Sequence, residues 1–401
     1  MKTQVASCNL RLPFAGSTPR ARPREPSLYG SLVLLVPALA PPVIEQPARY
    51  QASYGLVTGR AARGTTRVIV TANGRMLASK PLAGRRFSLR VELPVGDVTV
   101  GVTTTGHGRR SSAHIHDVLG LPSGSRPRIV AARQDAVLAR TVERVARGFG
   151  GTAAVYVQSL TGGTGAASNA RATFPAASTL KLAIATTVLA RHTGIPPPGS
   201  SVHDLLSEMI VHSDNASANA LEVWLGGSTS GGSHEINAVM RSIGLTDTEM
   251  YGGYELRTLS SRIPTRVDEQ PTYGYGKHTT ARDLTWLLRA IWLASGSRGP
   301  LHAEQPGFTA ADARYLLWLL AHVTDAPKLD RVRKGNPGVL VAHKAGWVNG
   351  ARHDAGLVFW RGGVFVAGVM TWNSRGVGTS GDVLAGRVAT AALERFRHTE
   401  G

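Results

Sequence analysis

The feature that most constrains the fold of this 401-residue chain is a change in its hydrophobic pattern. Over residues 48–117, apolar and polar residues alternate, for example along residues 87–93, and no segment has a helical period. Asn73-Gly74 separates two such runs, and both residues accept the positive φ angles of a tight hairpin turn. We therefore predict a small all-β sandwich over residues 48–117, immunoglobulin-like in type. It carries no cluster of catalytic residue types, which favours a spacer or binding role.

The pattern after this region mixes helices and strands. Residues 118–130 are rich in Pro, Gly and Ser and are predicted to form a linker. Residues 131–398 contain an early strand-like run at 152–159, several amphipathic helical segments, and further strand-like runs between 339 and 371. Helices placed between an early and a late group of strands predict an α+β or three-layer fold for this second domain.

The first 40 residues are predicted to be a secretory signal peptide. Residues 1–27 are basic, and the apolar run that follows ends in Ala38-Leu39-Ala40. The run is shorter than the roughly 20 residues that a bilayer requires, so no lasting membrane span is expected. A disordered leader or a start codon placed too early are the alternatives. We expect a secreted or cell-wall associated protein, which after cleavage would also lose its single cysteine, Cys8.

The charge balance is strongly basic. Lys and Arg number 45 against 26 Asp and Glu, for a formal charge of +19. Such a charge favours anionic surroundings, and an anionic cell wall would suit it. The arginines are scattered without an aromatic ladder or a known motif, so no nucleic acid partner is expected. Neither a metal nor an organic cofactor is expected, because one cysteine and histidines without ligand spacing provide no metal site. We expect a monomer.

A first chemical motif is Ser178-Thr179-Leu180-Lys181, at the start of a predicted helix. Ser178 and Lys181 would lie one turn apart on the same face. A serine hydroxyl becomes a nucleophile when a base removes its proton, and a lysine whose pKa is lowered by burial can be that base. Taken alone, however, the pattern is better explained by a helix-capping serine and a surface lysine.

Two further motifs follow along the chain. Ser213-Asp214-Asn215 precedes a predicted helix, where an ordinary N-cap is the simple explanation. The segment 344–346, Lys-Ala-Gly, comes after the strand-like run 339–343, where a strand end with a solvated lysine is the simple explanation. A glycine at that place also lets a substrate backbone approach the strand closely.

Together and in this order, the three motifs resemble the S-x-x-K, S-D-N and K-T-G signatures of class A β-lactamases and penicillin-binding proteins. The resemblance extends over about residues 135–398, and Thr279–Leu284 is similar to the family's T-T-P-x-D-M helix start. It implies an antiparallel sheet with helices on both sides. It also implies a serine hydrolase that acts on amide bonds, with a small-molecule β-lactam or a cell-wall peptide as substrate.

The resemblance implies a role for each matched residue. Ser178 would be the acylated nucleophile, and Lys181 would take part in activating it. Ser213 would relay a proton to the leaving nitrogen. Asn215 would hold Lys181 or the substrate side chain, and Lys344 would attract the substrate carboxylate.

The backbone of the third motif completes the implied site. Next to Gly346, the N–H group of Trp347 would form an oxyanion hole together with the N–H group of Ser178. Ala345 stands where the family has a threonine, so one hydroxyl that would bind the substrate carboxylate is missing.

The implied machinery for deacylation also departs from the family. The Ω-loop signature E-x-x-L-N is absent, and Glu255 is the nearest acid to the expected place of the deacylating base. A catalytic base and a surface loop acid are equally good explanations of Glu255. Two alternatives to a β-lactamase therefore stay open: a D,D-peptidase or penicillin-binding protein with slow deacylation, and a non-catalytic cell-wall-binding protein.

Overall fold

The computed structural model describes residues 39–254 and 276–400. Most of the predicted signal peptide, residues 1–38, and the predicted catalytic residue Glu255 therefore lie outside the described residues. Among the helices of the described ranges, none combines the length and the apolar character needed to cross a membrane.

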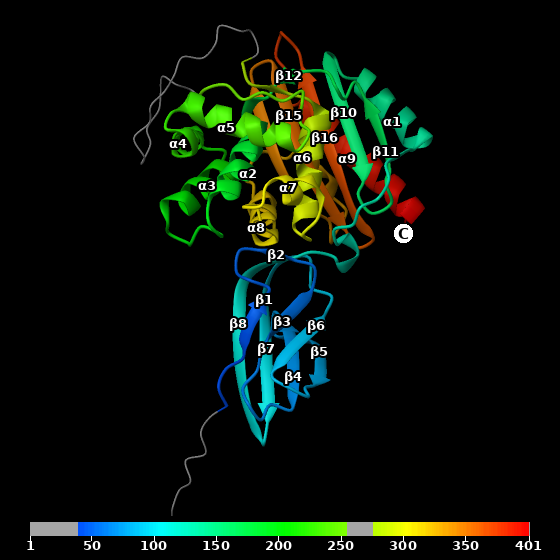
Figure 1. Cartoon of the computed structure of the whole chain (residues 1–401). Coiled ribbons are helices and arrows are strands. Elements are labelled where there is room, and N and C mark those ends of the chain that lie inside the picture. Colours follow the sequence, from blue (N-terminus) through cyan, green and yellow to red (C-terminus); the bar gives the residue numbers. More distant parts are fainter. Residues whose placement is uncertain (1–38, 255–275, 401) are drawn as a thin grey trace, which may run out of the picture. The chain divides into compact units, whose positions relative to one another are not determined.

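Residues 43–120 form strands joined by turns and loops, without a helix, and the strands are arranged in two sheets (Figure 1). Their bounds are β1 (Val43–Gln46), β2 (Ala52–Ser53), β3 (Leu56–Arg60), β4 (Arg67–Ala72), β5 (Arg75–Pro81), β6 (Arg86–Arg90), β7 (Gly96–Gly106) and β8 (Arg109–Gly120). One sheet has the order β1-β3-β6 and the other β2-β8-β7-β4-β5.

The side chains of these strands alternate as the sequence predicts. Phe87 and Leu89 of β6 are buried, whereas the arginines at both ends of β6 are exposed. The predicted hairpin turn joins β4 to β5, with φ of 50° at Asn73 and 80° at Gly74. Strand β8 runs to Gly120, three residues into the segment expected as a linker, because its last residues are apolar and buried rather than solvated.

The second part is built on a six-stranded sheet with the order β14-β15-β16-β10-β11-β9. Its strands are β9 (Arg133–Gln134), β10 (Thr152–Ser159), β11 (Thr164–Ser168), β14 (Leu340–Val348), β15 (Ala351–Trp360) and β16 (Gly363–Trp372). All neighbours are antiparallel except β9 and β11. Short strands β12 (Phe174–Pro175) and β13 (His278–Thr279) pair separately. The α+β class and the antiparallel sheet are thus confirmed.

Helices cover both faces of this sheet. They are α1 (Ala136–Arg147), α2 (Lys181–Arg191), α3 (Ser201–Val211), α4 (Asn215–Gly226), α5 (Thr229–Ser242), α6 (Ala281–Ala294), α7 (Gly299–Glu304), α8 (Ala310–Ala321) and α9 (Ser380–Glu400), with short 3-10 helices η1 (Ser123–Ser125), η2 (Ala177–Leu180) and η3 (Leu329–Arg333). Helices α1 and α9 lie together on one face (Figure 1).

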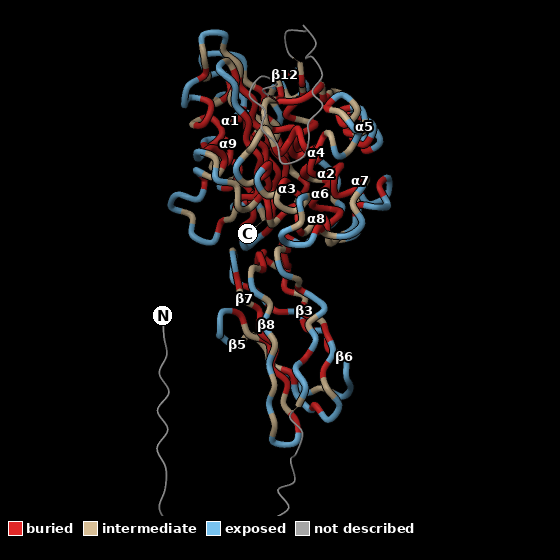
Figure 2. The backbone as a smooth tube through the Cα atoms, turned by 90° about the vertical axis from the view of Figure 1, so that its left-hand side faces the viewer, coloured by how far each residue is buried: buried red, intermediate tan, exposed pale blue. Residues whose placement is uncertain are grey.

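The two faces of the sheet bury different residues of the same strands. On β16, Phe365 and Val369 pack with α1 and α9, whereas Val366 and Met370 pack with the helices of the other face. Figure 2 shows that buried residues fill the interior of this α+β part. Because both faces are covered, the central strand β16 is apolar almost throughout, and the sheet supports the segments that carry the three motifs.

One expectation about the third motif is wrong. The strand does not end before Lys344, because β14 continues to Val348 and pairs with β15 along its whole length. Lys344 therefore lies in the middle of a paired strand, and its side chain is only 1% exposed. The solvated lysine that the sequence allowed is excluded by this burial.

Candidate active site

The turn that carries Ser178 has an unusual backbone. Ser178 is half-buried within η2, and Ala177 before it has a φ of 48°. A non-glycine residue in this left-handed region costs on the order of 1 kcal/mol or more and persists only where its surroundings hold it. Here the hydroxyl of Thr179 donates to the carbonyl of Ala176 at 2.6 Å, which closes the turn. The same turn leads directly into α2, whose first residue is Lys181.

Gly346 brings strand β14 against this turn. A Cβ atom at Gly346 would lie 2.8 Å from the backbone nitrogens of both Ser178 and Thr179. Only glycine permits so close an approach without a shift of one backbone against the other. The amide of Ser178 and that of Trp347, the two predicted oxyanion-hole donors, are thereby brought close together. The Trp347 side chain is itself 63% exposed, with its ring 5.9 Å from the guanidinium carbon of Arg352.

Lys181 connects the first motif to the second. Its side chain is fully buried, and Nζ donates to Asn215 Oδ1 at 2.5 Å and to Ser213 Oγ at 3.4 Å. Nζ also donates to the backbone carbonyl of Ser213. Ser213 has a φ of 59°, a second left-handed non-glycine residue, and this conformation places both its carbonyl and its hydroxyl near Lys181. The first two motifs are thus one hydrogen-bonded unit.

Lys344 connects the third motif to the same serine. Its Nζ donates to Ser213 Oγ at 2.9 Å, so the Ser213 hydroxyl lies between two lysine ammonium groups. A hydroxyl oxygen that accepts from two donors keeps its own hydrogen for a third partner. This geometry suits the proton relay that the resemblance implies for Ser213. Burial lowers the pKa of Lys344, and the neighbouring carboxylate of Asp325 partly opposes that shift.

The sequence reasoning missed Tyr254 and the residue that holds it. Asn219 Nδ2 donates to the Tyr254 carbonyl at 2.8 Å, and Asn219 Oδ1 accepts from the Tyr254 N–H at 2.6 Å. The Tyr254 ring then lies 4.9 Å from the ammonium of Lys181 and 4.4 Å from that of Lys277. The sequence did contain an indication of Asn219, because this residue follows Asn215 by four positions and therefore lies on the same face of α4.

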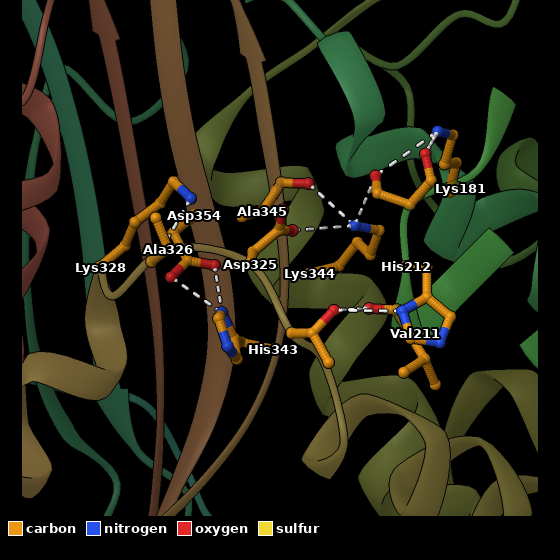
Figure 3. A network of polar contacts seen from close by, with 12 residues as sticks. Lys181, Val211, His212, Asp325, Ala326, Lys328, His343, Lys344, Ala345 and Asp354 are labelled. Atoms are coloured by element: carbon orange, nitrogen blue, oxygen red, sulfur yellow. Dashed lines mark hydrogen bonds and ion pairs between the residues drawn. The ribbon is translucent and has the colours of Figure 1, made fainter. Parts of the chain in front are cut away.

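A buried ion pair was also missed, on the other side of β14. His343 Nδ1 lies 2.8 Å from Asp354 Oδ1 (Figure 3). Asp354 also accepts from the Leu329 N–H at 2.9 Å. Burial alone would lower the pKa of His343, but the Asp354 carboxylate raises it overall. The pair fixes β14 to β15 next to Lys344. Among residues 39–254 and 276–400, no three His, Cys, Asp or Glu side chains are grouped to hold a metal ion.

Comparison with known proteins identifies the family. Residues 137–193 and 192–396 match the sequence profile described as the β-lactamase enzyme family. The chain therefore belongs to the β-lactamase enzyme family, which confirms the resemblance seen in the sequence. A search of curated proteins found no match.

Solved structures show the same fold. PBP-A superposes with a TM-score of 0.54 at 19% identity, over 68% of this chain and 100% of that one. A mutant of PBP-A, described as an acyl-enzyme complex with penicillin G, gives 0.52 at 20% identity over 67% and 100%. A variant of the last common ancestor of Gram-negative class A β-lactamases gives 0.51 at 22% over 66% and 100%.

Proposed function

We propose that this protein is an exported serine hydrolase that opens an amide bond, in a β-lactam or a cell-wall peptide, through an acyl-enzyme on Ser178. The observation that carries the proposal is the Ser213 hydroxyl, which accepts hydrogen bonds from the buried ammonium groups of both Lys181 and Lys344. Such a hydroxyl is poised to pass a proton to a group that arrives beside Ser178.

The acylation step uses the residues in this order. Lys181 must first lose one proton, because an ammonium group has no lone pair to accept one. The Ser178 hydroxyl then gives its proton to the neutral Lys181 amine as the serine oxygen bonds to the amide carbon, and the amides of Ser178 and Trp347 receive the negative charge on the carbonyl oxygen. The carbon–nitrogen bond then breaks. The proton returns from Lys181 through Ser213, 3.4 Å away, to the leaving nitrogen. Ser178 is left as an ester, which water must hydrolyse.

The missing Ω-loop signature E-x-x-L-N favours slow hydrolysis of that ester. Tyr254, held by Asn219, presents its ring to Lys181, and burial raises the pKa of the Tyr254 phenol well above its usual value. A phenol that keeps its proton cannot act as the base for water. The role predicted for Glu255, next in the chain, stays a prediction. A penicillin-binding protein or D,D-peptidase with a long-lived acyl-enzyme is therefore the favoured form of this function.

The test is intact mass spectrometry of the purified mature protein after mixing with benzylpenicillin. A stable adduct of one penicillin mass, absent from Ser178→Ala, would support a slowly deacylating enzyme. Rapid formation of the hydrolysed product without an adduct would instead indicate a β-lactamase. No adduct and no product would favour a cell-wall-binding protein. The N-terminal residue of the secreted protein, expected near Pro41, tests export in the same sample.

A further inference from the structure

Lys344, the lysine expected to attract the substrate carboxylate, already has a carboxylate of the protein beside it. Asp325, in the loop after α8, places Oδ2 3.3 Å from Lys344 Nζ (Figure 3). The same ammonium donates to Ser213 Oγ at 2.9 Å and to the Ala345 carbonyl at 3.2 Å. An ammonium group has three N–H donors, and each of these three has an acceptor within the protein. Lys344 therefore has its hydrogen bonds and its counter-ion before any substrate arrives.

The loop holds Asp325 in place from both sides. Before it, Thr324 donates to the carbonyl of Val211 at the end of α3, through both its backbone N–H and its hydroxyl, each at 3.0 Å. After it, the buried ammonium of Lys328 donates to the carbonyl of Ala326 at 3.1 Å. The Asp325 side chain is only 20% exposed. These contacts fix the backbone on both sides of Asp325 and thereby hold its carboxylate near Lys344.

This arrangement changes what Lys344 can attract. A substrate carboxylate beside Lys344 would share one ammonium with Asp325, and the two like charges would repel each other. Ala345 supplies a buried methyl group at the position where a hydroxyl could donate to that carboxylate. The missing hydroxyl donor at Ala345 and the neighbouring carboxylate of Asp325 both disfavour a carboxylate on the leaving-group side of the substrate.

We propose that Asp325 is a specificity-determining residue, and that the site acylates best on amides whose leaving side carries no carboxylate. This inference rests on the proposed acyl-enzyme function and narrows its substrate class. The preferred substrates would carry a neutral group, such as an ester or an amide, in place of that carboxylate. The reason is that the Asp325 carboxylate already balances the charge of Lys344.

The experiment compares two acyl donors that differ only in this charge. The rates at which benzylpenicillin and its methyl ester acylate the full mature chain are followed by intact mass spectrometry. The wild type should acylate with the ester at least as fast as with the acid. Asp325→Asn should accelerate acylation by the acid about tenfold, because a repulsive charge is removed, and should change the rate with the ester by less than about threefold.

Controls separate specificity from folding and from general charge. Glu235→Gln removes one negative charge at an exposed helix position that pairs with Arg191, and it should leave both rates unchanged. Asp325→Ser provides a second neutral variant if Asp325→Asn fails to fold. A wild type that strongly prefers the acid, or variants in which both rates fall together, would overturn the inference and leave the acyl-enzyme function intact. Acylation by neither compound would refute both.

Discussion

Substitution of Gly346 by alanine tests the contact between β14 and the nucleophile turn. The added Cβ would lie 2.8 Å from the backbone nitrogens of Ser178 and Thr179, whereas ordinary contacts begin near 3.4 Å. The difference, 3.4 − 2.8 = 0.6 Å, must be taken up by the backbone of the turn or of the strand. Neither neighbour is the free end of a flexible side chain, so the shift falls on the Ser178 amide itself.

The expected cost follows from what that amide does. Loss of one oxyanion-hole donor costs about a hundredfold to a thousandfold in rate, and a misplacement near 1 Å costs about a hundredfold. A shift of about 0.6 Å should therefore slow acylation of Ser178 by roughly tenfold to a hundredfold. The unfolding free energy should fall by only about 1–3 kcal/mol, the usual cost of overpacking.

The assay is the acylation rate with a fluorescent penicillin, measured beside the melting temperature of each variant. Gly150→Ala is the matched control, because a Cβ at Gly150 meets no atom within 4 Å and should change neither quantity. Acylation of Gly346→Ala at the wild-type rate, with an unchanged melting temperature, would show that the turn and the strand are not in the contact described.

Three further predictions concern the support of the site. Burial lowers the pKa of His353 from 6.5 to about 4. As the pH falls, His353 is therefore protonated in the unfolded chain before it is protonated in the folded protein. The unfolding free energy should fall by about 3 kcal/mol as pH drops from 6.5 to 4, and denaturant titrations should show a flatter dependence in His353→Gln. Asn219→Ala leaves two buried backbone groups of Tyr254 without partners and should lower the unfolding free energy by about 2 kcal/mol; an unchanged denaturation midpoint would contradict this. Ala177→Gly relieves a φ of 48° and should keep or raise the melting temperature, whereas Ala177→Val should lower it clearly in the same thermal scan.

The sequence by itself determined much of the local structure and named the candidate site residues. Alternation and the Asn73-Gly74 turn predicted the hairpin of β4 and β5, and the first motif was predicted to lie at the start of a helix, which is α2. These patterns are local because helical and strand periods arise between residues a few positions apart. The three motifs likewise appear as short strings, so Ser178, Ser213 and Lys344 could be named before any contact was known.

Only the tertiary structure decided how those residues act on each other. Lys344 and Ser213 are 131 positions apart in the chain, and no local pattern signals that their side chains meet at 2.9 Å. No local pattern indicates the position of Asp325 either, because it lies in a loop. Its neighbours in the chain are held by a carbonyl at the end of α3 and by a buried lysine. Lys344 looked like a solvated strand end because burial depends on which segments cover a strand. Packing of distant segments sets burial and charge pairing, and neither can be read from a local sequence pattern.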